Sequence, residues 1–271
     1  MSTTIQTELG YLIPSTEKPI YIASEAGADA RLDISAKFAS HAVTIHDARE
    51  KEPAPTLDRE GFRLIRHDTS VSDFYDDAEV SEVYEREAEN LVLQATGASH
   101  VVVFDNTRRS DATEIRGARN VREPSAVIHN DYSDASALRR ARDILSDQEA
   151  DARLQHRFAI VNVWRSIAGA VLTTPLAICD ARTIRDADLV ASERRAKDRI
   201  GELQLVIYNP DHRWYWFSAM TPDEVVLIKT FDSSLDGQAR RAIHTAFVNP
   251  DAPADAAPRE SIETRALVLF D

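Results

Sequence analysis

The sequence predicts a mainly β protein with packed α-helices, an α+β fold built on a β-sandwich or a β-barrel. The first observation is that most of the chain after Tyr132 consists of short strand-like segments separated by turn residues. The second is that the clearest amphipathic helices come before that part or at its beginning. Helices followed by a run of strands are typical of sheets that carry helices on their outer faces.

Before Thr107 the pattern predicts four strands and one long helix. The strands are expected at residues 19–22, 41–47, 62–65 and 100–105. The helix is expected from about Val71 to Thr96, because apolar side chains recur at spacings of three and four and Gly97 is placed to end it. Residues 107–124 are polar and are predicted to form a turn-like connection.

After Asp131 the pattern predicts another helix and then a series of strands. Ser133 or Asp134 can cap a helix that runs to about Asp147. A further helix is predicted near residues 186–197. The strands are expected at residues 158–164, 176–179, 203–208, 213–217, 225–230 and 264–270.

Length and composition limit the classes of function. A chain of 271 residues with 43% hydrophobic and 28% charged residues is ordinary for a globular protein, and all-β proteins of this length commonly form one domain. The net charge of −13 argues against nucleic acid as a partner, and the apolar runs are too short to span a membrane. Cys179 is the only cysteine and no secretory signal is visible, so a cytoplasmic setting is expected. A homodimer is left open.

The segment Val127–Tyr132 carries the pattern on which the functional interpretation rests. Successive side chains of a strand point to opposite faces, so His129 and Asp131 project the same way while Asn130 points away. A histidine and an aspartate on one strand face are two thirds of a 2-His-1-carboxylate site, which holds Fe(II) and leaves coordination positions open. The tripeptide alone is a weak signal, so its interpretation depends on a third ligand and a co-substrate anchor.

A candidate third ligand and a candidate co-substrate anchor are both found downstream of this segment. His244 is the preferred third ligand because it is followed by Arg259 and Ser261, which share a strand parity and can face the same cavity. A guanidinium beside a hydroxyl is a good receptor for a carboxylate. His212 is the rival ligand, but it lies in a turn before an aromatic strand and no Arg-x-Ser pair follows it at a comparable separation.

These motifs, in this order, resemble the Fe(II)/2-oxoglutarate-dependent oxygenases built on a double-stranded β-helix. More specifically, the chain is similar to the family that groups the cephamycin 7α-methoxylation protein CmcJ, the fungal oxygenase NvfI and the gibberellin desaturase-like proteins. Nearly the whole chain carries the similarity, most densely in the later stretches 127–132, 160–165, 175–182, 208–216, 221–224, 229–233, 244–247 and 258–265.

The resemblance implies a single oxygenase domain over residues 1–271 with a double-stranded β-helix (jelly-roll, cupin-like) core. Residues 1–125 would support the barrel and residues 126–271 would form the metal-bearing core. It also implies that His129, Asp131 and His244 hold Fe(II), and that Arg259 and Ser261 bind 2-oxoglutarate. With O2 as the other co-substrate, succinate and CO2 would be the co-products.

The expected reaction is hydroxylation, desaturation or cyclisation of a small-molecule metabolite, in natural-product biosynthesis. Halogenation is not favoured, since halogenases of this superfamily typically replace the carboxylate ligand by a small residue and Asp131 is present.

Other side chains are weaker candidates. Arg165 follows a strand that should line the barrel, so it could contact co-substrate or form a structural ion pair instead. Arg108 precedes the site and could bind a substrate carboxylate, although a solvated loop charge is the ordinary interpretation. Aromatic residues that could wall a substrate pocket, but that in strands are more often core, are Tyr132, Trp164, Trp214 and Trp216.

Two alternatives to an oxygenase are kept. One is a metal-dependent isomerase or hydrolase that uses the same His129, Asp131 and His244 without 2-oxoglutarate. Arg259 and Ser261 disfavour this alternative, because they have no evident role in such an isomerase or hydrolase. The other is a non-catalytic cupin-like module that binds a small molecule and whose histidines are structural.

Overall fold

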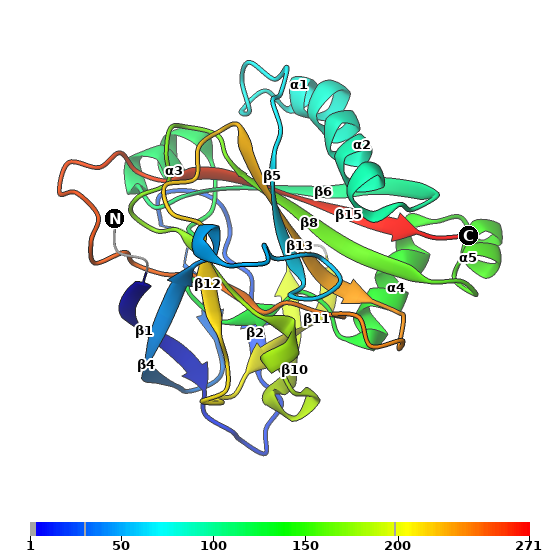
Figure 1. Cartoon of the computed structure of the whole chain (residues 1–271), viewed down its shortest axis with the longest axis horizontal. Helices are drawn as coiled ribbons and strands as arrows, with labels where there is room; N and C mark the ends of the chain where they lie inside the picture. Colours follow the sequence, from blue (N-terminus) through cyan, green and yellow to red (C-terminus); the bar gives the residue numbers. More distant parts are fainter. Residues whose placement is uncertain (1–3, 30, 198) are drawn as a thin grey trace.

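The computed structural model describes residues 4–29, 31–197 and 199–271, and it consists of two facing β-sheets with helices outside them (Figure 1). Within the described residues, the larger sheet has ten strands in the order β1-β4-β12-β9-β14-β7-β11-β10-β2-β3, and the smaller has five in the order β5-β13-β8-β15-β6. The smaller sheet is antiparallel throughout. The prediction of a mainly β fold with a jelly-roll core and packed helices is confirmed.

The strands of the larger sheet are β1 (Thr4–Leu12), β2 (Ile20–Ile22), β3 (Asp33–Ile34), β4 (Phe38–Asp47), β7 (His129–Asn130), β9 (Leu176–Cys179), β10 (Leu189–Ala196), β11 (Arg199–Val206), β12 (Trp214–Trp216) and β14 (His244–Ala246). Those of the smaller sheet are β5 (Phe62–Arg66), β6 (His100–Ser110), β8 (Phe158–Ser166), β13 (Glu224–Asp232) and β15 (Glu260–Leu269). The helices are α1 (Asp77–Glu79), η2 (Val80–Tyr84), α2 (Glu85–Thr96), α3 (Thr113–Arg119), α4 (Asp134–Ile144) and α5 (Asp147–Arg153), with short 3-10 turns η1 (Ala48–Glu50), η3 (Ala181–Thr183) and η4 (Asp186–Asp188).

The prediction of a helix near residues 186–197 is wrong. Only η4 is helical there, and the following residues form β10, which pairs antiparallel with β11 and parallel with β2. Helix-favouring residues such as Ala, Glu and Arg have weak intrinsic preferences, so pairing with two neighbouring strands outweighs them.

Four other features differ from the sequence prediction. The long helix begins at Asp77, because the Asp76 carboxylate accepts hydrogen bonds from the backbone N–H groups of Ala78 and Glu79 and caps it there. The helix after Asp131 ends at Ile144, and a separate helix, α5, starts after the capping residue Ser146. The stretch 107–124 contains the end of β6 and α3, and β1 also lacks a predicted counterpart.

The two faces of the smaller sheet have different neighbours. Its outer face packs on α2, where Ala88, Leu91 and Val92 contact residues such as Val163 and Val268. In Figure 1 this helix runs over β6, β8 and β15. The inner face turns toward the larger sheet, and Trp164 packs there with Ile178. Side chains that alternate along β8 and β15 therefore lie either under the helix or in the space between the sheets.

Strands from the two halves of the chain pair directly in both sheets. β4 lies beside β12, and β6 lies beside β15 over its whole length. The site described below is held between these sheets. Across the residues that the structure describes, no helix is both long enough and apolar enough to cross a membrane.

Candidate metal centre

His129, Asp131 and His244 meet in the space between the two sheets. His129 on β7 and His244 on β14 are directly opposite each other in an antiparallel pair, and their ring centroids are 4.5 Å apart. Asp131 follows β7, and its Oδ1 lies 3.5 Å from His129 Nε2. One ligand atom from each of the three residues lies within 4.8 Å of the other two. The structure thus brings together the three side chains that the sequence singled out from positions far apart.

Both imidazoles present Nε2 toward this cluster. The Nδ1 atom of each ring lies near a carbonyl of its own chain segment, 2.7 Å from Val127 O for His129 and 3.3 Å from Ala242 O for His244. Such contacts fix the tautomer that leaves Nε2 as the ligand atom. His244 Nε2 is buried and has no hydrogen-bond partner among the described residues. A buried polar atom without a partner costs free energy, and a metal ion at this point would satisfy it.

The protonation states suit a divalent metal. Burial, followed by the charge of His129, lowers the pKa of His244, so the ring is neutral near pH 7. Burial by itself raises the pKa of Asp131, but Arg265 and the two histidines outweigh it and hold this pKa well below its ordinary value. The donor set is therefore two imidazoles, of which that of His244 is neutral, and one carboxylate, the set that suits non-haem Fe(II). These residues fit the metal that the sequence resemblance implies.

Asp131 is oriented by two side chains that the sequence reasoning did not single out. Asn162 on β8 donates to Asp131 Oδ2 at 2.7 Å, and Arg265 Nε on β15 donates to the same oxygen at 3.0 Å. Arg265 in turn pairs with Asp105 and Glu263. A signal for Arg265 existed, because it shares strand parity with Arg259, Ser261 and Glu263.

Arg259, the residue before β15, and Ser261 on β15 face the same way, toward the space between the sheets. Arg259 Nε donates to Ser261 Oγ at 3.0 Å, and Nη1 donates to the carbonyl of Thr174 at 2.7 Å. The guanidinium also lies 4.9 Å from the centre of the Trp164 ring. Burial, followed by repulsion from Arg109, lowers the pKa of Arg259 to about 9. This is a buried cation to which an anion would be strongly attracted.

The charge of Glu263 links this anchor to the metal ligands. Glu263 lies between Arg259 and Arg265 on the inner face of β15, and it influences the pKa of both His244 and Arg259. By strand alternation Arg259, Ser261 and Glu263 face the same side of the smaller sheet as Arg265, which donates to Asp131. The rival ligand His212 lies elsewhere, with Nε2 3.2 Å from Asp188 Oδ2 and Nδ1 3.3 Å from the Tyr11 hydroxyl.

The structure does not bring Arg165 to this space. Its neighbour Trp164 faces the interior, so Arg165 points to the outer face, where its guanidinium lies over the rings of Phe74 and Tyr84 and donates to the carbonyl of His67. The reason is strand alternation, since only every second residue of β8 faces the ligands. The guanidinium is a structural group beneath η2 and the segment that precedes α1.

The other weak candidates divide in the same way. Trp164 faces the interior, and Tyr132 lines a cavity together with Asp131. Trp214 and Trp216 lie on the opposite face of their sheet, packed with Ile45 in a separate core. Trp214 donates there to the Tyr11 hydroxyl. Arg108 pairs with Asp77 and lines a different surface cavity from the one next to Asp131. Of the five, only Trp164 and Tyr132 lie on the side of the molecule that holds the three candidate ligands.

Comparisons with known proteins agree with this geometry. A family model described as an oxidoreductase/YMDC permease-like domain matches residues 9–269. The chain is 32% identical over 259 residues to the hydroxylase/desaturase efuI of Hormonema carpetanum, which covers 87% of this chain and 85% of the relative. It is 34% identical over 237 residues to the Fe(II)/2-oxoglutarate-dependent dioxygenase nvfI of Aspergillus novofumigatus, covering 84% and 83% of the two chains.

The fold leads to the same group of proteins. A solved structure of the iron and alpha-ketoglutarate-dependent endoperoxidase NvfI superposes with a TM-score of 0.86 at 29% identity, covering 99% of this chain and 98% of the other. The relatives are oxygenases, so the isomerase, hydrolase and binding-module alternatives are set aside. The chain is an oxygenase that belongs to the family of these hydroxylase/desaturase and Fe(II)/2-oxoglutarate-dependent dioxygenase proteins.

Proposed function

We propose that this oxygenase holds Fe(II) with His129, Asp131 and His244 and binds 2-oxoglutarate with Arg259 and Ser261. When bound, the iron and 2-oxoglutarate would couple reduction of O2, with release of succinate and CO2, to oxidation of a small-molecule substrate. The organic substrate would be a natural-product intermediate that is hydroxylated, desaturated or cyclised. Support for this class of substrate comes from relatives named as hydroxylase/desaturases and from one named for aspirochlorine biosynthesis.

The chain's own residues would bind and orient the reactants. The two backbone carbonyls at Val127 and Ala242 hold the imidazoles with Nε2 inward, and Asn162 and Arg265 hold one oxygen of Asp131 so that the other faces His129. This leaves one carboxylate oxygen and two ring nitrogens for the metal. The apolar residues Trp164 and Ile178 beside the site would exclude water from it.

The observation that carries the proposal is the unpaired guanidinium of Arg259. It is 3% exposed, and within the described residues it contacts a hydroxyl and a carbonyl but forms no ion pair with a carboxylate. Asp111 lies nearby, but its oxygen accepts from the backbone N–H of Arg259. A buried cation is stabilised by an anionic partner, and the distal carboxylate of 2-oxoglutarate would provide one with charge-assisted hydrogen bonds.

We further propose that residues 1–271 form one oxygenase domain with residues 126–271 as the metal-bearing core. The pairing of early and late strands in both sheets supports a single unit. A cytoplasmic location is also proposed, and it is supported by a buried, free Cys179.

The test measures conversion of 2-oxoglutarate to succinate by the purified protein supplied with Fe(II) and O2. Wild-type protein is expected to produce succinate, and a chelator is expected to abolish it. Arg259→Gln removes the charge of the anchor and should raise the KM for 2-oxoglutarate about tenfold or more, since a charge-assisted hydrogen bond contributes about 1.5–3 kcal/mol.

Arg66→Gln is the matched control, because Arg66 is an 82% exposed side chain that pairs with Asp223 on the surface. Its KM should equal that of the wild type. The proposal would be rejected if succinate formed equally well without iron, or if Arg259→Gln left the KM unchanged.

A further inference from the structure

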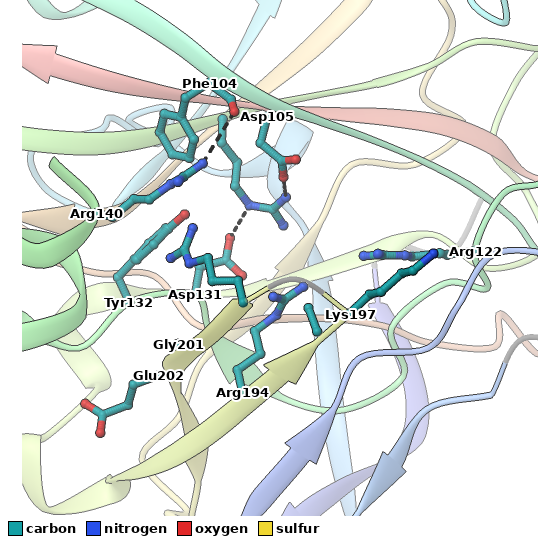
Figure 2. Close-up of a pocket in the computed structure, with 13 residues that line it drawn as sticks. Phe104, Asp105, Arg122, Asp131, Tyr132, Arg140, Arg194, Lys197, Gly201 and Glu202 are labelled. Carbon is teal, nitrogen blue, oxygen red and sulfur yellow. Dashed lines mark hydrogen bonds and ion pairs between the residues drawn. The ribbon is translucent and has the colours of Figure 1, made fainter. Parts of the chain in front are cut away.

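A polar cavity with a volume of about 280 Å³ opens beside the candidate metal centre. Figure 2 shows Asp131 near its middle in this view, with Arg194 below it and Arg122 at its right side. Asp131 and Arg265 belong both to this cavity and to the metal centre. A smaller cavity of about 30 Å³ next to His129 shares four lining residues with it, namely Arg122, Asp131, Arg194 and Arg265. A molecule in the larger cavity would therefore lie against Asp131 and Arg265.

The lining carries an excess of positive charge. Six cationic side chains face this cavity, namely Arg122, Arg140, Arg194, Lys197, Arg199 and Arg265. The chain as a whole has a net charge of −13, so this local excess runs against the composition of the protein. Clusters of guanidinium groups repel one another, and proteins retain them where an anion binds.

The acidic residues of the lining are already paired with other groups. Asp105 Oδ2 accepts from Arg265 at 2.5 Å, and Asp131 is engaged by Arg265 and Asn162. Glu202 pairs with Lys18 on the surface and accepts from Ser133. These three carboxylates account for the acids that line the cavity.

Four other guanidinium groups line the cavity without an ion pair to a carboxylate among the described residues. One of them, Arg140, lies 4.7 Å from the centre of the Phe104 ring and donates to the Phe104 carbonyl, which leaves three. Within the described part of the chain, Arg122, Arg194 and Arg199 form no ion pair with a carboxylate, and all three are half-buried. Their surroundings are electrostatically unfavourable. Burial, then repulsion from Arg109 and Arg194, lowers the pKa of Arg122. Burial, then repulsion from Arg265, lowers the pKa of Arg194, and burial with repulsion from Arg140 does the same for Arg199.

We propose that Arg122 and Arg194, with Arg199 beside them, bind an oxyanion of the organic substrate, either a carboxylate or a phosphate. This inference rests on the proposed function, since it places the anionic end of the substrate next to the metal ligands. It is a second anion site, separate from Arg259, which does not line this cavity. The substrate is thus a free acid or a phosphorylated molecule, and a neutral ester or lactone lacks the group that these side chains recognise.

The test measures binding to the anaerobic protein loaded with Fe(II) and saturating 2-oxoglutarate, so that Arg259 is occupied and no turnover occurs. The probes are isophthalate and pyrophosphate, with isophthalamide as the uncharged match, and the measurement is isothermal titration calorimetry. At least one anion is expected to bind about tenfold or more tightly than the amide. Tighter binding of isophthalate would identify the substrate's anionic group as a carboxylate, and tighter binding of pyrophosphate would identify it as a phosphate. Either preference supports the proposal.

The variants are Arg194→Gln and Arg122→Gln, which lie on different segments, so that a folding defect in one leaves the other informative. Each should weaken anion binding about tenfold, the effect of losing one charge-assisted contact of 1.4 kcal/mol. Arg195→Gln is the control, because Arg195 is the next residue of β10, points to the other face and pairs with Glu193. Its affinity should match the wild type.

The proposal fails if the anions bind no more tightly than isophthalamide, if saturating 2-oxoglutarate abolishes their binding, or if Arg195→Gln weakens it as much as Arg194→Gln. Failure of the proposed function would be seen earlier and separately, as a lack of 2-oxoglutarate binding in the loading step. Intact 2-oxoglutarate binding without anion binding would overturn this inference alone.

Discussion

Among the described residues, the buried histidine–aspartate cluster around His212 differs from the one formed by His129, Asp131 and His244, which is suited to hold a metal. Around His212, Nε2 lies 3.2 Å from Asp188 Oδ2, Nδ1 lies 3.3 Å from the Tyr11 hydroxyl, and the ring stacks on Tyr11 at 5.7 Å. Both nitrogens have partners. At the candidate metal centre, Nδ1 of His129 and of His244 lies near a carbonyl, whereas His244 Nε2 has no partner among the described residues.

The two aspartates differ in the same sense. Asp188 Oδ2 already accepts from Asn209, His212 and the backbone of Arg185, so the cluster is closed. Asp131 Oδ2 is engaged by Asn162 and Arg265, while Oδ1 faces His129. A structural cluster satisfies its polar atoms internally, and a ligand set keeps convergent atoms unsatisfied until the ligand arrives.

The largest expected effect comes from removing a ligand. His129→Ala or His244→Ala leaves two protein ligands and should abolish iron-dependent succinate formation, measured with saturating 2-oxoglutarate. His212→Ala is the matched change in the other cluster and should retain turnover at a temperature where it is folded. Loss of turnover in His212→Ala with retention in His244→Ala would reverse the assignment of the two clusters.

The next effect concerns the side chains that orient Asp131. Asn162→Ala removes the 2.7 Å hydrogen bond to Oδ2 and should weaken metal affinity about 10–100-fold, the usual cost of losing a group that orients a metal ligand. Titration with Fe(II) under anaerobic conditions measures it. Asn106→Ala is the control, since Asn106 donates to Glu85 on the outer side of the sheet. Equal affinities in the two variants would contradict the role given to Asn162.

A smaller effect is expected on stability at the closed cluster. His212→Ala removes a buried ring with two partners and leaves a cavity, which should lower the free energy of unfolding by about 2–4 kcal/mol. Urea unfolding of the metal-free protein measures it. Ordinary surface substitutions change the free energy of unfolding by about 0.5 kcal/mol or less. A loss no larger than that would show that the cluster is not structural.

The smallest effect is a dependence on pH. Burial lowers the pKa of His212 although Asp188 opposes it, so the unfolded state takes up a proton near pH 6.5 and the folded state only at lower pH. Stability from this group is present above about pH 6.5 and is lost as pH falls through the lowered folded pKa.

Replacing His212 by Gln should make the unfolding free energy less steep in that window, by at most about 1.4 kcal/mol per pH unit. Urea unfolding of both proteins at a series of pH values from 7.5 downward measures the two slopes. Part of the slope will persist, because burial also lowers the pKa of His67 and His244. Identical slopes in wild type and variant would show that His212 is not perturbed in this way.

Much of the site followed from local spacing. His129 and Asp131 share a strand face because they are two residues apart, and the same holds for Arg259 and Ser261. The residues that were missed, Asn162 and Arg265, act on Asp131 from strands far away in the chain. No local sequence pattern predicts that β8 and β15 bring side chains to the aspartate that follows β7. For the same reason the local pattern of residues 186–197 predicts a helix where the structure has β10, since its pairing partners determine its conformation.

The amino-acid sequence alone determined the fold class, the approximate places of most strands, and which residues share a face within each strand. These depend on side-chain period and turn chemistry, which are local properties. Only the tertiary structure decided which faces meet. It placed Arg165, Trp214 and Trp216 away from the ligands, closed His212 into a structural cluster, and gathered Arg122 and Arg194 beside Asp131. Pairing between distant strands sets those relations, and it depends on the packing of the whole chain.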